Sequence, residues 1–195
     1  MNKAAKTKQF IVEKTAPIFN IKGYAGTSLS DMTDATGLTK GSIYGNFTNK
    51  DEVALAAFDH NLQKIRDIIQ REMDKKETMR DKLLVHVSVY ENFLQFPFPQ
   101  GGCPILNTGV EADDTHPILK KKAGDAIESW KDRVKGLVEE GVRSGEFKAS
   151  ADAQRFAVTM IAMIEGAIMI AKVSGKLAYR TIVLDELKKM IGRLV

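Results

Sequence analysis

The stretch from Thr27 to Asp51 constrains the fold most, because it has the pattern of two short helices joined by a tight turn. Ser28 and Asp31 have the spacing of a capping box, in which a hydroxyl accepts a first-turn backbone N–H and an acid reaches back to the cap residue. Gly37 can adopt the positive φ that ends a helix. The sequence therefore predicts a helix from Ser28 that ends at Gly37, and its apolar edge would be formed by Leu29, Met32 and Ala35.

A second short helix is predicted directly after this turn. Thr39 is a suitable N-cap, and about two helical turns follow from Lys40 to Phe47. Ile43 and Phe47 are four residues apart, so both would point into the protein. The residues that would face outward are Lys40, Gly41, Ser42, Tyr44 and Asn46.

Two helices in this arrangement are typical of a helix-turn-helix, whose second helix enters the major groove of DNA. Gly41 and Ser42 are small enough for close approach, and Lys40 can donate to guanine or to phosphate. Tyr44 offers a hydroxyl for phosphate, and Lys50 would lie near a neighbouring phosphate at the start of the next helix. Many all-α proteins contain two short helices joined by glycine, so the spacing alone leaves both a DNA-binding and a purely structural interpretation open.

One ordered set of motifs extends this pattern on both sides: Phe19, Gly23-Tyr24, Thr27-Ser28, Ala35-Thr36-Gly37, Lys40-Gly41-Ser42-Ile43-Tyr44, Phe47 and Asn49-Lys50-Asp51-Glu52. With these motifs the segment 10–58 resembles the N-terminal domain of TetR/AcrR-family transcriptional regulators. The resemblance implies a homodimeric, all-helical repressor, in which three helices bind DNA and the other helices form a dimerising, ligand-binding body. It implies phosphate contacts by Thr27, Ser28, Tyr44 and Lys50, and places Thr39, Lys40, Gly41 and Ser42 nearest the bases.

The sequence departs from the family pattern in two places. Gly45-Asn46 stands where the family often has a histidine or an aromatic residue, so the contacts at that end of the second helix are open. Pro17 falls inside the predicted first helix, about Lys3 to Lys22, where the missing backbone donor can kink a helix or make it start anew.

Length and charge support a small DNA-binding domain and a larger body. The chain has 195 residues and a formal net charge of +4. Residues 1–50 carry seven lysines and three acidic residues, so the whole excess of positive charge lies there, as a polyanionic partner would favour. We expect an all-α protein with a DNA-binding domain over 1–58 and a ligand-binding and dimerisation domain over 59–195. The boundary would fall inside a long helix that starts at Asn49, because no flexible linker separates the two parts.

The C-terminal part predicts a dimer interface. A helix over about Ala151 to Ser174 is apolar nearly all round, and the next, about Ala178 to Val195, is apolar on one side. Such a helix needs cover on every side, so we expect both helices to pair with their symmetry mates. Glu165 near the middle of the apolar run favours a helix of a soluble protein over a membrane span. No secretory signal is recognisable, which predicts a cytoplasmic protein.

Cys103 is the single cysteine and follows Gly101-Gly102 at the start of a possible short helix, a place that can lower the pKa of a thiol. The string Gly-Cys-Pro-Ile-Leu-Asn also resembles a segment of one branch of the TetR family, in which some members sense electrophiles through that cysteine. A small, unreactive residue packed under a loop is the simpler interpretation. A thiol-dependent redox protein or small helical enzyme that uses Cys103 is the alternative to a regulator.

The remaining candidates are weaker. His60, His86 and His116 match no metal-ligand spacing, so they are expected to be ordinary surface or helix-end residues, and neither a metal nor a cofactor is expected. Glu165 can serve as a polar contact at the dimer interface, as a pocket acid for a cationic ligand, or as a surface residue. Aromatic and methionine side chains suit an effector pocket between helices, although such residues also form ordinary cores. The candidate pocket residues are Tyr90, Phe93, Phe96, Cys103, Trp130, Met160, Met163 and Glu165.

Overall fold

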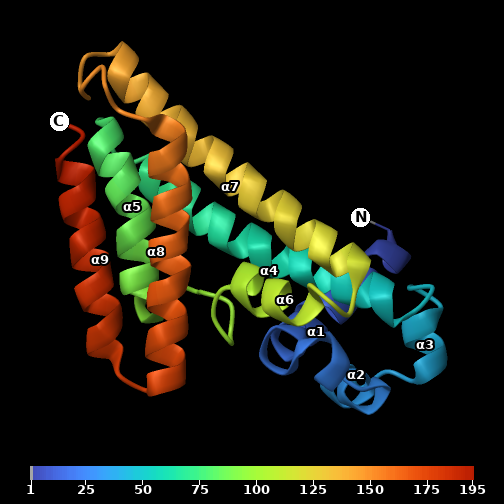
Figure 1. Ribbon diagram of the computed structural model, residues 1–195. Helices are drawn as coiled ribbons and strands as arrows, with labels where there is room; N and C mark the ends of the chain where they lie inside the picture. The colour runs from blue at the N-terminus through green and yellow to red at the C-terminus, as the bar shows by residue number, and fades with distance from the viewer. Residues whose placement is uncertain (1) are drawn as a thin grey trace. The chain divides into compact units, whose positions relative to one another are not determined.

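A computed structural model describes residues 2–195, without the side chain of Leu94. Over these residues the chain is all-helical, as predicted (Figure 1). The nine α-helices and one 3-10 turn are α1 (Lys3–Gly26), α2 (Leu29–Thr36), α3 (Lys40–Tyr44), α4 (Lys50–Met73), α5 (Met79–Glu91), η1 (Phe93–Gln95), α6 (Pro104–Ala112), α7 (Pro117–Arg143), α8 (Ala153–Ser174) and α9 (Leu177–Gly192).

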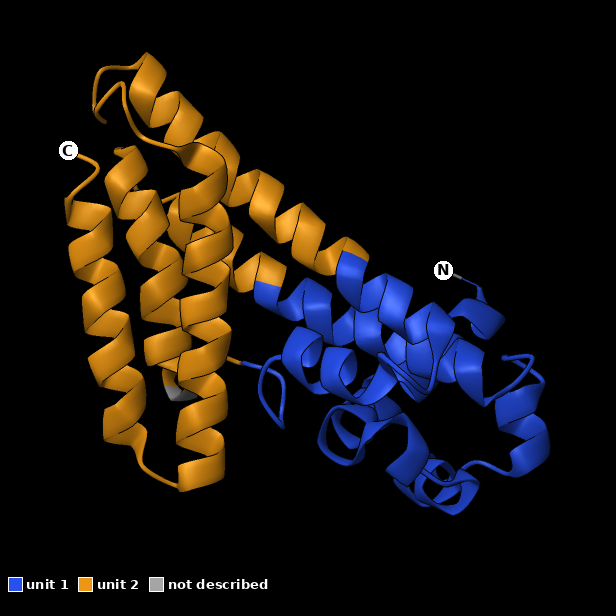
Figure 2. Ribbon diagram, viewed as in Figure 1, with its two compact units in different colours: residues 1–65, 98–124 blue, residues 66–97, 125–195 orange. Residues whose placement is uncertain are grey.

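The helices form two compact units, coloured separately in Figure 2. Unit 1 comprises residues 1–65 and 98–124, and unit 2 comprises 66–97 and 125–195. The chain passes between the units within α4 and within α7. Unit 1 thus holds the predicted helix-turn-helix together with α6, a helix that lies beyond the predicted DNA-binding domain of residues 1–58.

The core of unit 1 is built from the apolar faces of its first four helices. Ile43 is fully buried and Phe47 is 2% exposed, which confirms that this pair points inward. Each such burial stabilises the fold by about 1.5–3 kcal/mol. The same cluster contains Ile11, Val12, Ala16, Phe19, Met32, Val53, Ala54 and Ala57.

The ends of α2 agree with the sequence prediction. The Ser28 hydroxyl accepts a hydrogen bond from the Asp31 backbone N–H at 3.0 Å, and the Asp31 carboxylate accepts one from the Ser28 N–H at 2.8 Å. Gly37 has φ of +67° and ends the helix. The capping box and the glycine stop therefore fix both ends of the first helix of the helix-turn-helix.

One helix prediction was wrong in detail, because α3 ends at Tyr44 rather than Phe47, and its C-cap is Gly45, a residue type that disfavours helix interiors. The first helix breaks at Gly23, directly after the predicted end at about Lys22, with φ of +73° and ψ of 178°, and it remains helical through Pro17. The break falls at Gly23 because only a residue without a Cβ adopts this conformation readily.

Unit 2 contains α5, α8 and α9, and α8 and α9 pack side by side as a hairpin (Figure 1). Gly175, with φ of +70°, ends α8 directly before this hairpin's turn. The Thr78 side chain caps α5 by accepting from the Asp81 N–H at 3.0 Å. The buried side chains of these three helices include Leu83, Val87, Met160, Ile164, Leu184, Leu187 and Ile191.

His86 corrects the prediction for the histidines, because it lies in the interior of unit 2 rather than at the surface or a helix end. Its side chain is 2% exposed, and Nδ1 accepts a hydrogen bond of 3.2 Å from the Trp130 indole N–H. Tyr90 also stacks with Trp130, with 5.5 Å between the two ring centroids. Burial, and to a lesser extent the charge of Arg133, lower the pKa of His86 to about 4. The local sequence pattern could not show this, because α5 and α7 meet far apart in the chain.

Candidate nucleic-acid interface

The exposed side of α3 is a small, polar surface at the position predicted for a recognition helix. Thr39, Lys40 and Gly41 are exposed, and Ser42 and Tyr44 are partly exposed. The Thr39 hydroxyl caps the helix by accepting from the Ser42 N–H at 3.2 Å. The buried Ile43 and Phe47 hold the opposite side of this segment in the core. The local fold therefore turns Lys40, Gly41 and Ser42 toward solvent and keeps Ile43 and Phe47 inside.

Gly41 leaves open space at the middle of this surface. A Cβ placed on this residue would have the Thr39 hydroxyl, 3.9 Å away, as its nearest contact. Its φ is not in the positive region, so neither packing nor backbone conformation requires glycine here. No contact within the chain explains why residue 41 is glycine. Close approach by an outside partner would explain it, because glycine has no side chain in the way.

The flanking residues differ in how far they reach the surface. Ser28 is exposed, and Asn46 is partly exposed, with its side-chain amide donating to the Ser42 carbonyl at 2.9 Å. Thr27 is fully buried, and its hydroxyl donates to the Gly23 carbonyl at 2.6 Å. The predicted phosphate contact of Thr27 is therefore not available to its side chain, which instead binds the bend at the end of α1.

Lys50 lies beside an aromatic and polar cluster at the start of α4. Its ammonium group is 4.3 Å from the centroid of the Tyr24 ring. The Tyr24 hydroxyl donates to Asp51, and the edge of Tyr24 meets the ring of His116, with centroids 4.5 Å apart. The Asp51 hydrogen bond and partial burial raise the pKa of Tyr24 to about 12, so the phenol stays neutral and the contact stays in place. Local sequence patterns could not place His116 in this cluster, because it is distant in the chain from Tyr24 and Lys50.

Two acidic residues of this region, Asp31 and Glu52, are already paired with lysines. Lys22 contacts Asp31 at 2.6 Å, and Lys8 contacts Glu52 at 2.6 Å. These lysines and adjacent backbone N–H groups hold the pKa values of both carboxyls down to about 2. Over the residues that the structure describes, no carboxylate forms an ion pair with Lys40 or Lys50. The positive charges at α3 and at the start of α4 thus remain available to an anionic partner.

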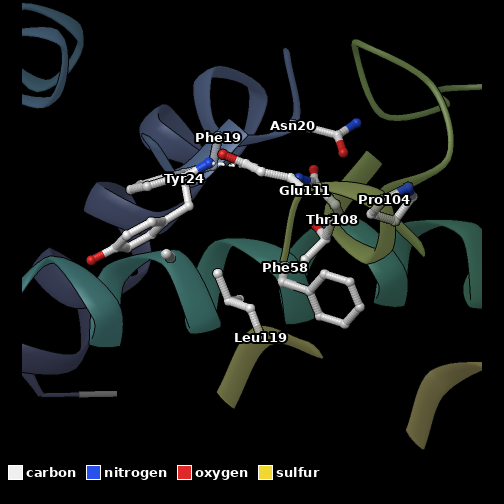
Figure 3. Close-up of a pocket in the computed structure, with 10 residues that line it drawn as sticks. Phe19, Asn20, Tyr24, Phe58, Pro104, Thr108, Glu111 and Leu119 are labelled. Atoms are coloured by element: carbon white, nitrogen blue, oxygen red, sulfur yellow. Dashed lines mark hydrogen bonds between the residues drawn. The ribbon is translucent and has the colours of Figure 1, made fainter. Parts of the chain in front are cut away.

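The candidate pocket residues do not gather in one unit. Cys103 belongs to unit 1, is 1% exposed and stands at the N-cap of α6. The other seven lie in unit 2, where Tyr90, Trp130 and Met160 are buried and Phe93, Phe96, Met163 and Glu165 are partly exposed. A small hollow is present in unit 1 between α1, α4 and α6 (Figure 3), and it has room for about one water molecule. Within the described part of the chain, no group of three His, Cys, Asp or Glu side chains could hold a metal ion.

Comparison with known proteins agrees with this geometry. Residues 11–57 match the model of the bacterial regulatory proteins of the tetR family, and residues 79–186 match that of the tetracyclin repressor-like C-terminal domain. A crystal structure of a TetR-family transcriptional regulator from Cytophaga hutchinsonii is 46% identical, with a TM-score of 0.96 over 100% of this chain and 97% of that one.

Two further proteins show how far the similarity extends. The transcriptional regulator TtgR of Pseudomonas putida is 28% identical over 171 residues, which cover 85% of this chain and 80% of that protein. The transcriptional regulator FadR of Bacillus subtilis, solved in complex with stearoyl-CoA, shares the fold at 20% identity and a TM-score of 0.72, over 92% of this chain and 96% of that one. The two family models and the helix-turn-helix geometry lead to one conclusion: the chain belongs to the TetR family of DNA-binding transcriptional regulators.

Proposed function

We propose that the protein is a homodimeric repressor that binds a palindromic operator through α3 and leaves it when an effector binds. The surface of α3 carries this proposal, since Lys40, Gly41 and Ser42 form an exposed, small and cationic edge on a rigidly capped helix. The residues that would contact DNA are Ser28, Thr39, Lys40, Gly41, Ser42, Tyr44, Asn46 and Lys50. DNA binding would belong to residues 1–58, and effector binding and dimerisation to residues 59–195.

The dimer proposal rests on the exposed apolar side chains of α8 and α9. α8 has a mean hydropathy of 1.9 in its most apolar window, and only 39% of that window is buried within the chain. By length and composition α8 is also the one helix of residues 2–195 that could cross a membrane, a test that core helices of soluble proteins pass as well. We propose that these exposed apolar side chains form a dimer interface through residues 151–195. A DNA-binding regulator needs access to DNA, so we also propose that the protein is cytoplasmic. The exposed apolar residues are Val158, Met169, Ile170, Val173, Leu177, Tyr179 and Ile182.

A two-fold symmetric dimer would require a DNA site with matching two-fold symmetry. A two-fold dimer presents two copies of α3, and they enter successive major grooves only when spaced by about one helical turn of DNA, roughly 34 Å. An effector that binds better to a dimer with another spacing would then release the operator. The operator would therefore be an inverted repeat.

The effector would be a small molecule, as FadR in complex with stearoyl-CoA illustrates for a protein of the same fold. The buried aromatic group of Tyr90, Trp130 and His86 makes unit 2 the favoured place for it. A thiol-reactive effector at Cys103 is the second route, and it requires a local opening because the thiol is 1% exposed. As a TetR-family regulator the protein is not an enzyme, so catalysis by Cys103 is set aside.

Selection of bound duplexes from a random DNA pool tests the proposal. We expect an enriched inverted repeat, bound more weakly by Lys40→Ala and by Tyr44→Phe while both variants keep the wild-type thermal stability. Retention of all duplexes with one salt-dependent affinity would show non-specific binding only and would refute a sequence-specific regulator.

A further inference from the structure

The bend in α1 at Gly23 leaves two backbone groups in need of partners. The turn after Gly23 restarts the helix just before the helix-turn-helix, so the first N–H groups of this turn lack helical acceptors. These are the N–H groups of Tyr24 and Ala25. They lie four and three residues before Ser28, the N-cap of α2. Whatever binds them also sets the direction in which the chain enters the helix-turn-helix.

Glu111 of α6 supplies both acceptors. One carboxylate oxygen accepts from the Tyr24 N–H and the other from the Ala25 N–H, each at 2.8 Å. Figure 3 shows its side chain extended from α6 toward the end of α1. A carboxylate that receives two N–H groups at a helix start forms charge-assisted hydrogen bonds, which are stronger than neutral ones.

The fit at Gly23 is tight. A Cβ added to Gly23 would stand 2.3 Å from the nearer Glu111 oxygen. Gly23 thus serves two requirements at once, the positive φ of the bend and the space for the Glu111 carboxylate. The bend and the acid are matched to each other although Tyr24 and Ala25 lie 87 and 86 positions before Glu111 in the sequence.

One helical turn before Glu111, Asn107 makes a second set of contacts to α1. Its side-chain amide donates to the Asn20 carbonyl at 2.9 Å and to the Gly101 carbonyl at 3.0 Å. The Asn20 amide in turn donates to the carbonyls of Gln100 and Gly102 at 2.6 and 2.9 Å. These contacts hold α6 and the loop before it against the same end of α1.

We propose that Glu111 is a positioning residue for DNA binding, which orients the helix-turn-helix by holding the bend of α1, and that Asn107 supports it. This inference rests on the proposed operator binding. It assigns a role in DNA recognition to α6, outside the segment 10–58 that carries the family motifs. A change in α6 that withdraws the carboxylate would release the bend without touching α3.

The test compares Glu111→Ala and Glu111→Gln with wild type. Glutamine keeps one acceptor oxygen but places an amide N–H₂ where the second acceptor was, so its effect should be intermediate. We expect affinity for the selected operator to fall about tenfold in Glu111→Ala and about threefold in Glu111→Gln. Affinity for a duplex without the inverted repeat should stay within about twofold, because non-specific binding depends mainly on positive charge near the phosphates and does not require α3 to be in register with particular bases. Asp114→Asn, an equal charge change at an exposed residue, is the matched control and should bind as wild type.

Amide hydrogen exchange provides a readout that does not depend on DNA. The Tyr24 and Ala25 amides should exchange faster in both variants, while the amides of α2 remain close to wild type. The lost hydrogen bonds should lower the melting temperature, but both variants should be fully folded at the assay temperature. Equal losses on both duplexes would reduce Glu111 to a stability residue and overturn the proposal. Unchanged exchange at Tyr24 and Ala25 would overturn it as well. If the wild-type protein preferred no DNA sequence, the proposed operator binding itself would be refuted. The selection experiment on wild type shows this before any Glu111 variant is made.

Discussion

The indole N–H of Trp130 donates a hydrogen bond of 3.2 Å to Nδ1 of His86 inside unit 2. Burial disfavours the charged form of the His86 side chain, so its pKa of about 4 lies below the unfolded value of 6.5. The unfolded chain therefore takes up a proton before the folded one does. The free energy of unfolding should fall as the pH is lowered from 6.5 to 4, by on the order of 3 kcal/mol from this residue.

His86→Gln tests this prediction, because glutamine cannot titrate and its carbonyl can still accept from Trp130. Urea unfolding at pH 7 and at pH 4.5 should show a smaller loss of stability in the variant than in wild type. The other two histidines are present in both proteins, so the difference isolates His86. Equal pH dependence in the two proteins would mean that His86 is accessible to protons in the folded state.

A charge placed in the exposed apolar surface of α8 and α9 should break the dimer. Val173 is 83% exposed and Ile182 is 61% exposed in the single chain, so Val173→Asp and Ile182→Asp should fold normally. In a dimer the same carboxylates would be buried without a partner, at a cost of several kcal/mol. Sedimentation at micromolar concentration should show dimers for wild type and monomers for both variants.

The control for this experiment is Val110→Asp, which introduces the same change at a residue of α6 that is 71% exposed. This variant should remain dimeric. A wild-type protein that sediments as a monomer, or charge variants that remain dimeric, would refute an interface through residues 151–195.

The thiol of Cys103 should react slowly in the folded protein. It is 1% exposed, and modification by maleimide therefore has to wait for a local opening of the loop before α6. Mass spectrometry should show little modification after minutes in native buffer and complete modification in denaturant. Rapid modification that also releases bound operator would favour the thiol-reactive effector, whereas an unmodified thiol leaves that route without support.

Local sequence patterns predicted the helix-turn-helix well because its determinants are local. The Ser28 and Asp31 cap, the Gly37 stop and the inward pair Ile43 and Phe47 are each set by residues within a few positions. The family resemblance added the prediction that the rest of the chain is also helical. What the sequence could not show are contacts between distant segments, such as Glu111 with Tyr24. Neither its residue type nor its spacing from other residues sets Glu111 apart from the other acidic residues of the chain.

The same limit explains the errors. Thr27 was expected at the DNA surface because of its place in the motif, but the bend at Gly23 turns its hydroxyl inward. His86 was expected at the surface or at a helix end because histidines are commonly polar surface residues, but Trp130 offers it a buried partner. The effector pocket residues remain a prediction, since they depend on a ligand whose shape the sequence does not encode.

The central claim is that α3 enters a DNA groove, and the substitution Gly41→Ala tests it most directly. Alanine fits the open space and favours a helix over glycine, so stability should be unchanged or higher by about 0.5–1 kcal/mol. Gly136→Ala in α7, where a Cβ also meets no neighbour within 4 Å, is the matched control. Titration of a labelled operator should show at least about tenfold weaker binding for Gly41→Ala and wild-type binding for Gly136→Ala. Equal operator affinity for wild type and a stable Gly41→Ala would contradict the insertion of α3 into DNA.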